Sequence, residues 1–281
     1  MTPGYQALRE SAGWLDLTGR GKIVARGEDR VRLLHAMTTN HVERLAPGGG
    51  CYAFFLDAHG HILADVNLFA MTDYILLDLE PEVARKIYAH LDRHIVADDV
   101  SLEDVTAGYA TFAVEGPRAA EVLAAAGAPV PVDAYSHIVW GTRIVARAAG
   151  FLVFAPLAER EEIVRALEAA GAVAASADDA LVVRLEDGRP RYGDDITEDH
   201  LPQETQQLHA LHFSKGCYIG QEIVERIRAR GHVNRLLVRL TLDGDQPPAR
   251  GTRLPEGEIT SAAYSPALGK VVALAYVRAE R

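Results

Sequence analysis

The sequence predicts an α+β protein built from two ferredoxin-like modules and a small C-terminal β-barrel. The order strand, helix, several strands, helix, strand occurs twice between residues 22 and 186, which is typical of ferredoxin-like units. After Arg235 no helical period is left, and short apolar runs alternate with glycine, proline and aspartate. This second pattern is typical of a small antiparallel barrel or sheet.

The first module is expected to follow a short N-terminal helix at residues 5–12. A loop at Pro47 and the three glycines after it comes before a β-rich block. Pro81 stands in the first turn of a helix, where its missing N–H is tolerated, and apolar residues follow at four-residue steps. The expected elements are a strand at 22–26, a helix at 29–38, strands at 52–56, 62–69 and 74–79, a helix from Pro81 and a strand at 100–105.

The second module repeats this order of elements, although its residues do not repeat. Gly127 and Pro129 end one predicted helix, and Gly171 ends another. Turns that contain glycine join three of the strands. The expected elements are a strand at 109–114, a helix at 117–126, strands at 137–140, 142–147 and 151–155, a helix at 159–170 and a strand at 180–186.

The C-terminal region is expected to form strands at residues 236–242, 257–261 and 270–276. Three domains fit within the 281 residues, because a chain of this length with 48% apolar residues can form more than one core. The domains that we expect are a first module at 1–106, a second module at 107–232 and the barrel at 233–281, with interleaving of the two modules allowed.

Charge and cysteine usage limit the classes of partner. The net charge of −10 argues against nucleic acid as a partner. No apolar run is long enough for a membrane span, and no signal peptide is apparent at the N-terminus. Cys51 and Cys217 form neither a disulfide framework nor a metal-ligand pattern. We therefore expect a monomeric protein in a reducing, cytoplasmic environment.

The most informative stretch is Lys-Gly-Cys-Tyr-Ile-Gly-Gln-Glu at residues 215–222. Cys217 lies in a glycine-flanked turn just before a predicted helix, with Lys215 and Arg226 nearby in the sequence. Such a position favours the reactive thiolate form of a cysteine. The alternative is that Cys217 is a small buried apolar residue in a tight turn. The residues alone leave both interpretations open.

A helix is expected directly after Gly220. Glu222 and Arg226 are four residues apart in the order that stabilises a helix. Arg226 also begins a basic strip, which indicates either a specific anionic ligand or a solvated helix face. The members of this strip are Arg226, Arg228, Arg230, His232 and Arg235.

Histidine spacing does not predict a metal site. His90 and His94 are four apart on a predicted helix, but no third ligand is evident, and an exposed helix face explains them better. The four cysteines that would hold an iron–sulfur cluster stably are also missing. Any contact with such a cluster is therefore expected to be transient or shared.

The string at residues 215–222 resembles the signature of the YgfZ family, folate-binding proteins connected with iron–sulfur cluster assembly and repair. That family is related to the T-protein of the glycine cleavage system, an aminomethyltransferase that uses tetrahydrofolate. The resemblance implies a T-protein-like ring of three lobes around a central hole that holds tetrahydrofolate or a one-carbon derivative. Further segments that resemble the family are 27–42, 57–65, 115–123, 184–204 and 260–277.

The resemblance also implies roles for individual residues. Cys217 is implied as the reactive group, and Lys215 as a partner that holds the glutamyl tail of folate with the nearby arginines. Glu186 matches the T-protein position that binds the pterin ring, and a carboxylate can accept two N–H bonds from that ring; the alternative is an exposed acid at a strand end. The implied folate contacts are Asp65, Asp78, Glu186, Tyr192, Gln221, Glu222 and Arg226.

Two departures separate this chain from the T-protein pattern. T-proteins carry two adjacent aspartates where this chain has Ala64 and Asp65, and an asparagine near the position of Asp78. The sequence therefore predicts a tetrahydrofolate-binding accessory protein for assembly or repair of iron–sulfur proteins, with iron–sulfur client or scaffold proteins as partners. The alternatives are a folate-dependent aminomethyltransferase or demethylase, and a non-catalytic module that docks RNA or an acidic protein.

Overall fold

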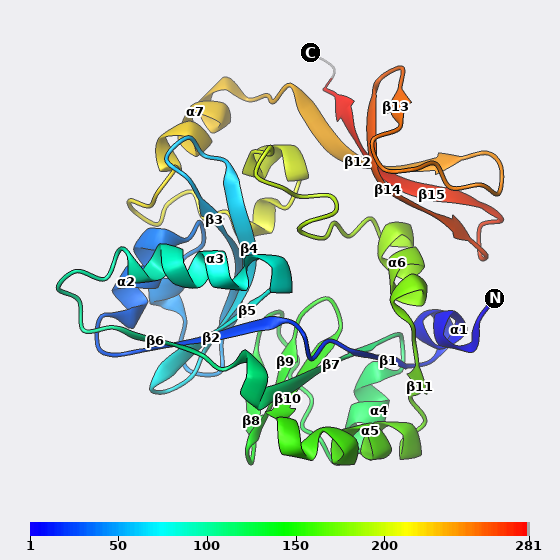
Figure 1. Cartoon of the computed structure of the whole chain (residues 1–281), viewed down its shortest axis with the longest axis horizontal. Coiled ribbons are helices and arrows are strands. Elements are labelled where there is room, and N and C mark those ends of the chain that lie inside the picture. Colours follow the sequence, from blue (N-terminus) through cyan, green and yellow to red (C-terminus); the bar gives the residue numbers. More distant parts are fainter. Residues whose placement is uncertain (280–281) are drawn as a thin grey trace.

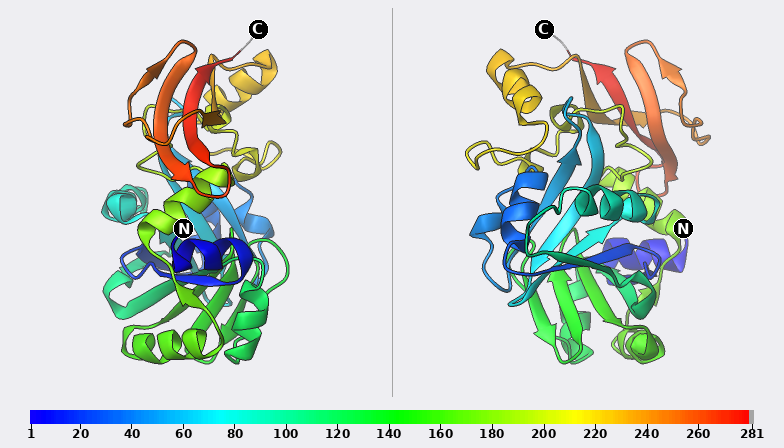
Figure 2. Two further views of the ribbon diagram at one scale, coloured as in Figure 1. Left: turned by 90° about the vertical axis from the view of Figure 1, so that its right-hand side faces the viewer. Right: turned by 60° about the vertical axis from the view of Figure 1, so that its left-hand side comes forward.

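The computed structural model describes residues 1–279 and contains three lobes arranged around a centre (Figure 1). A five-stranded sheet, a six-stranded sheet and a four-stranded sheet form the cores of the lobes. The C-terminal sheet lies at the end of the molecule opposite to the six-stranded sheet (Figure 2). This arrangement confirms the expected α+β fold with a C-terminal sheet of barrel type. Within residues 1–279, no helix has both the length and the apolar character needed to cross a bilayer.

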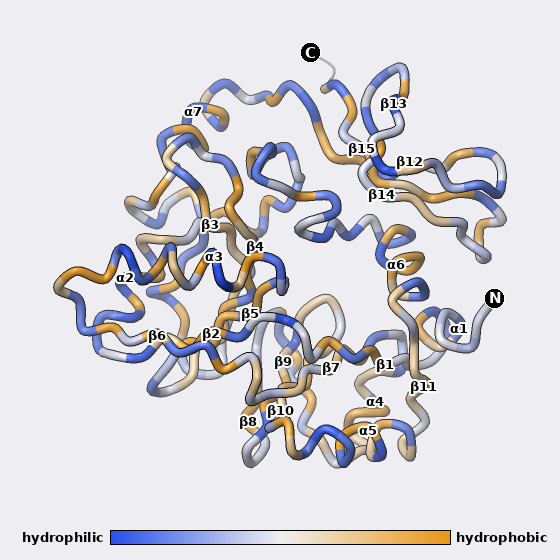
Figure 3. The backbone as a smooth tube through the Cα atoms, in the orientation of Figure 1, coloured by the Kyte–Doolittle hydropathy of each residue, from blue (hydrophilic) through white to orange (hydrophobic). Residues whose placement is uncertain are grey.

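The first lobe is an antiparallel sheet in the order β3-β4-β5-β2-β6. Helix α3 (Pro81–Asp92) packs on β2 and β4, and α2 (Arg30–Met37) joins the same core. Hydrophobic residues are concentrated in β4 and β5 (Figure 3). The strands are β2 (Gly21–Arg26), β3 (Gly50–Leu56), β4 (Ile62–Ala70), β5 (Tyr74–Leu79) and β6 (Ser101–Asp104).

The second lobe is a sheet in the order β11-β1-β7-β10-β9-β8. Strand β1 (Gly13–Asp16) pairs with β7 although it comes before every strand of the first sheet, so the two modules interleave along the chain. Helices α4 (Ala119–Ala125) and α5 (Arg160–Ala169) pack on this sheet. The other strands are β7 (Tyr109–Glu115), β8 (His137–Trp140), β9 (Arg143–Arg147), β10 (Phe151–Pro156) and β11 (Val173–Ala174).

The strand predicted at residues 180–186 is wrong, because this segment is the end of helix α6 (Ala177–Glu186). Ser176 caps the helix: its hydroxyl accepts the N–H of Asp179, and the Asp179 carboxylate accepts the N–H of Ser176. The apolar run that resembles a strand is buried on more than one side, since α6 contacts both α1 (Pro3–Glu10) and the C-terminal sheet. A helix buried in this way shows no single apolar stripe.

The third lobe is a curled antiparallel sheet, half of a barrel, in the order β12-β15-β14-β13. A bulge between Ile259 and Ser261 interrupts the pairing of β14 with β15, and such bulges increase the bend of a strand. The strands are β12 (Arg235–Leu242), β13 (Arg253–Leu254), β14 (Gly257–Ser265) and β15 (Lys270–Arg278). Helix α7 (Gln221–Arg230) precedes this lobe.

The connection between α6 and α7 fastens the lobes to one another. Arg191 forms ion pairs with Glu80 at 2.7 Å and with Glu82 at 2.8 Å, which fixes the connection to the end of the first sheet. On its other side, the Asp195 carboxylate accepts the hydroxyl of Thr260 in β14 at 2.6 Å. The connection therefore spans the region between the first lobe and the C-terminal sheet.

Candidate functional site

Asp65 on β4 is a partly buried carboxyl group near the connection. The hydroxyl of Tyr52 on β3 donates a hydrogen bond to its Oδ2 at 2.9 Å. Burial raises the pKa of Asp65 to about 6, and the negative charge of Glu80 adds to this effect. A carboxyl group with this pKa exchanges its proton close to neutral pH, which is the property required of a general acid or base.

The carboxylate of Asp78 on β5 is bound by other side chains of the protein and has a structural role. The Asp78 side chain is fully buried. Arg20 donates to both carboxylate oxygens, at 2.8 and 2.9 Å, and the amide of Asn67 donates to Oδ2 at 2.9 Å. Arg20 also pairs with Glu80. The folate contact expected of Asp78 stays a prediction, and this geometry argues against it because the carboxylate is already bidentately bound.

Tyr192 connects the segment after α6 to the first sheet. Its hydroxyl donates to the carbonyl of Leu63 at 2.8 Å, and the ammonium group of Lys86 lies 5.9 Å from the centre of its ring. Burial raises the pKa of Tyr192, and the charges of Glu198 and Asp65 add to this effect. Tyr192 and Asp65 therefore belong to one neighbourhood, as expected for residues that line a common site.

Glu186 is buried at the end of α6. The alternative expectation, an exposed acid at a strand end, is therefore wrong. The Oε1 atom of Glu186 accepts the hydroxyls of Tyr5 and Ser265, each at 2.6 Å. Its Oε2 lies 3.3 Å from Nε of Arg9 but accepts no hydrogen bond from residues 1–279. One oxygen of a buried carboxylate thus has hydrogen-bonding capacity left, which is uncommon in folded proteins.

Lys215 supports the end of helix α2. Its side chain is buried, and its Nζ donates to the carbonyl of Thr38 at 2.6 Å and to the carbonyl of His35. Burial lowers the pKa of Lys215 to about 8. The ammonium group is therefore committed to the unpaired carbonyls of a helix terminus, and this argues against its predicted contact with the glutamyl tail of folate.

The two cysteines occupy opposite environments. Cys217 is exposed, so the interpretation as a small buried apolar residue is wrong. Cys51 is a buried free thiol whose pKa is raised to about 12 by burial. An exposed thiol in a loop is open to partners and reagents, whereas a buried neutral thiol is inert.

Gln221, Glu222 and Arg226 lie on α7, where Arg226 pairs with Glu222 at 2.8 Å. Both side chains of this pair are largely exposed, and within residues 1–279 the three residues make no hydrogen bond or ion pair with Asp65 or Glu186. The folate contacts expected of these three residues stay predictions. The structure brings Asp65 and Tyr192 together, but it does not bring α7 to them.

A stack of three aromatic rings that includes Tyr52, the hydrogen-bond partner of Asp65, was not singled out from the sequence. Tyr52, Tyr135 and His209 lie nearly parallel, with ring centres 5.3 Å apart for Tyr52 and His209 and 6.5 Å apart for the two tyrosines. Tyr135 has a φ of 58°, a rare conformation for a large side chain. Strand alternation could have identified Tyr52, because residues 52 and 54 share a face and Phe54 is paired with Asp65.

Comparison with known proteins shows the family. The GCVT N-terminal domain matches residues 2–149, and the glycine cleavage T-protein C-terminal barrel domain matches residues 235–281. The aminomethyltransferase of Rubrobacter xylanophilus is 32% identical over 98% of this chain and 78% of its own length, and that of Chloroherpeton thalassium is 30% identical over 98% and 81%.

A solved structure shows the same fold. The crystal structure of the glycine cleavage system aminomethyltransferase T from Bartonella henselae superposes with a TM-score of 0.89 at 21% identity, and it covers 98% of this chain and 80% of its own. The sequence relationship and the shared three-lobed fold agree over nearly the whole chain. The chain therefore belongs to the glycine cleavage T-protein family.

Proposed function

We propose that this protein binds tetrahydrofolate between its lobes and takes part in one-carbon transfer of the aminomethyltransferase type. Aminomethyltransferases of this family use tetrahydrofolate as their one-carbon carrier. The observation that best supports the proposal is Asp65, a carboxyl group with a pKa raised to about 6 and a hydrogen bond from Tyr52. Such a group can hold or accept a proton near neutral pH.

Glu186 is a second residue that fits a bound pterin. The Oε2 atom of Glu186 is buried and accepts no hydrogen bond from residues 1–279, and a pterin presents N–H donors on one edge. Glu186 would hold the pterin through this oxygen while Tyr5 and Ser265 keep Oε1 in place. Tetrahydrofolate would supply the nitrogen atoms that accept the one-carbon unit. Asp65 would hold or release the proton that this transfer moves.

A second candidate function is the accessory role in iron–sulfur protein assembly or repair that the YgfZ-like signature implies. The observation that favours it is the exposed thiol of Cys217 in a loop that Lys215 anchors to α2. Ala64, where T-proteins carry an aspartate, also favours it, because this buried residue supplies no second carboxylate beside Asp65. In this role the thiol would contact a client protein while folate binds elsewhere in the molecule.

Calorimetric titration with tetrahydrofolate tests the main proposal. We expect one molecule to bind per chain, Glu186→Gln to weaken binding by about ten-fold because hydrogen bonds to charged groups are worth about 1.5–3 kcal/mol, and Cys217→Ser to leave it unchanged. Absence of binding by the unmutated protein would contradict the proposal. For the second candidate, iron–sulfur enzyme activity in cells that carry Cys217→Ser should fall, whereas activity equal to that of the unmutated protein would argue against it.

A further inference from the structure

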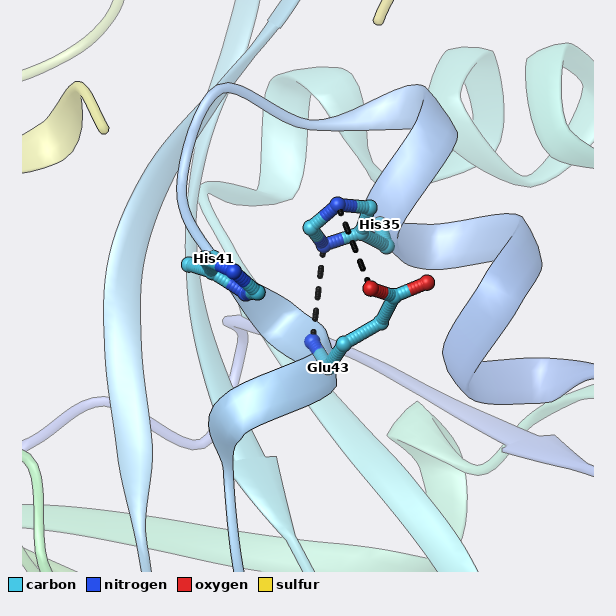
Figure 4. A group of neighbouring side chains, drawn as sticks. All are labelled: His35, His41 and Glu43. Carbon is cyan, nitrogen blue, oxygen red and sulfur yellow. Dashed lines mark hydrogen bonds and ion pairs between the residues drawn. The ribbon is translucent and has the colours of Figure 1, made fainter. Parts of the chain in front are cut away.

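A group of three potential metal ligands lies at the C-terminal end of α2 (Figure 4). His35 is in the last turn of α2, His41 follows the helix, and Glu43 is in the short 3-10 helix Val42–Arg44. Each offers one ligand atom, and these atoms lie within 4.8 Å of one another. Spacing along the sequence did not indicate this group, because its three members come from a helix, a loop and a 3-10 helix.

The three side chains already face one another. Nε2 of His35 lies 3.7 Å from Oε2 of Glu43, and the rings of His35 and His41 have centres 4.7 Å apart. In a tetrahedral site with bonds of about 2.0–2.1 Å, ligand atoms are separated by about 3.3–3.4 Å. Small side-chain movements would therefore bring all three ligand atoms to one ion.

His41 provides an independent indication of a missing partner. Its Nδ1 is buried from solvent and has no hydrogen-bond partner within residues 1–279. Buried ring nitrogens usually have a partner, because leaving one unpaired costs free energy. A bound cation would supply the partner that this nitrogen lacks.

The hydrogen-bonding pattern of His35 is compatible with coordination. A metal ion binds imidazole through a ring nitrogen that carries no proton. Coordination through Nε2 of His35 moves the ring proton to Nδ1 and gives up the long contact of 3.4 Å with the Glu43 N–H.

We propose that His35, His41 and Glu43 form a binding site for a divalent first-row transition metal such as Zn²⁺ or Fe²⁺. Two imidazoles and one carboxylate with open positions are a ligand set typical of these ions. The site lies next to the segment that contains Cys217, because Lys215 bonds the carbonyl of His35. The positive charges of Lys215 and Arg44 reduce the affinity for a cation, and the two imidazoles and the carboxylate must offset this repulsion. The proposal does not depend on folate binding.

Calorimetric titration of the metal-free full-length protein with Zn²⁺ tests the site, and titration with Co²⁺ followed by visible absorption reports the ligands. We expect one ion per chain. Glu43→Gln and His41→Gln should each weaken binding by about 100-fold or more, since outer-shell partners alone are worth about 10–100-fold. The Glu43 side chain is half exposed, so Glu43→Gln should leave the melting temperature of the metal-free protein unchanged. If His41→Gln folds poorly, metal binding by Glu43→Gln alone tests the site.

His94→Gln is the matched control. The rings of His90 and His94 are 4.9 Å apart at the same tilt of 57° as those of His35 and His41, but within residues 1–279 no carboxylate joins them in a three-ligand group. This variant should bind Zn²⁺ like the unmutated protein. Absence of binding, binding that Glu43→Gln leaves unchanged, or equal loss in His94→Gln would each overturn the proposal.

Discussion

The hydroxyl of Tyr52 donates a hydrogen bond of 2.9 Å to the carboxylate of Asp65 across the β3–β4 hairpin. Tyr52 is paired with Asn67 and Phe54 with Asp65, so Tyr52 and Asp65 are diagonal neighbours on one face of the sheet. The ring of His209 lies parallel to that of Tyr52 and limits its movement. The phenol is therefore positioned by the fold rather than by the carboxylate that it bonds.

The first prediction concerns this hydrogen bond. It stabilises the ionised form of Asp65, so Tyr52→Phe should raise the pKa of Asp65 further above 6. A hydrogen bond to a charged group is worth about 1.5–3 kcal/mol, and one pKa unit corresponds to about 1.4 kcal/mol, so we expect a rise of about one to two units. Carboxyl ¹³C chemical shifts measured against pH would report it. An unchanged pKa in Tyr52→Phe would mean that the hydrogen bond from Tyr52 does not contribute to the pKa of Asp65.

The second prediction concerns stability. The pKa of Asp65 is higher in the folded protein, about 6, than the ordinary value of 3.8, so the folded state binds its proton more tightly. This contribution is fully present below pH 4 and is lost as the pH rises through 6. Asp65→Asn should therefore stabilise the protein at pH 8 by about 3 kcal/mol and leave it nearly unchanged at pH 4.

Urea unfolding of both proteins at pH 4, 6 and 8 measures this difference. A gain that is equal at all three pH values would show that it comes from packing and not from the carboxylate. If the proposed function is correct, the variant should also bind tetrahydrofolate but lose one-carbon transfer, because residues kept for function often reduce stability.

Local patterns predicted most of the fold. Strands β3, β4 and β5 and helix α3 lie within a few residues of their expected positions, because each shows alternation or a four-residue step along the sequence. Helix α6 was missed because its apolar run suggested a strand. The capping pair of Ser176 and Asp179 was present in the sequence and would have indicated the helix.

The candidate site was less predictable because its contacts join distant residues. Asp78 is bound by Arg20, which lies 58 positions earlier, and no local period indicates such a pair. His90 was expected on an exposed helix face, but it is buried beside Phe55. The role of the signature at 215–222 stays a prediction, and only the structure shows that Lys215 is buried there and Cys217 is exposed.

The third prediction concerns Lys215. Lys215→Met removes the donor that pairs with the carbonyls of His35 and Thr38, and buried groups left unpaired cost about 1–3 kcal/mol each. We expect the free energy of unfolding at pH 7 to fall by about 2 kcal/mol. Lys86→Met is the control, since that ammonium group is partly exposed and its loss should cost less than about 1 kcal/mol. Equal losses in the two variants would mean that the bonds to α2 contribute little.

The pH dependence of the same variant provides a further check. The pKa of Lys215 is about 8 in the folded protein and 10.5 as its ordinary value, so the unfolded state binds its proton more tightly. The cost of burying this charge is present below pH 8 and is relieved as the pH rises toward 10.5. The free energy difference between Lys215→Met and the unmutated protein should therefore widen between pH 8 and 10. A difference that narrows over this range would contradict the assignment.

The fourth prediction separates the two thiols. Cys217 is exposed, whereas Cys51 is buried with a pKa raised to about 12, and only the thiolate form of an accessible cysteine reacts with a disulfide reagent. The native protein should release one equivalent of chromophore with such a reagent at pH 8, and the urea-unfolded protein two. Cys217→Ser should abolish the reaction of the native protein and change the free energy of unfolding by less than about 0.5 kcal/mol, as for other surface positions. Two fast equivalents in the native state would show that β3 opens readily at Cys51, and a large loss of stability in Cys217→Ser would show that the thiol supports the fold instead of being free for a partner.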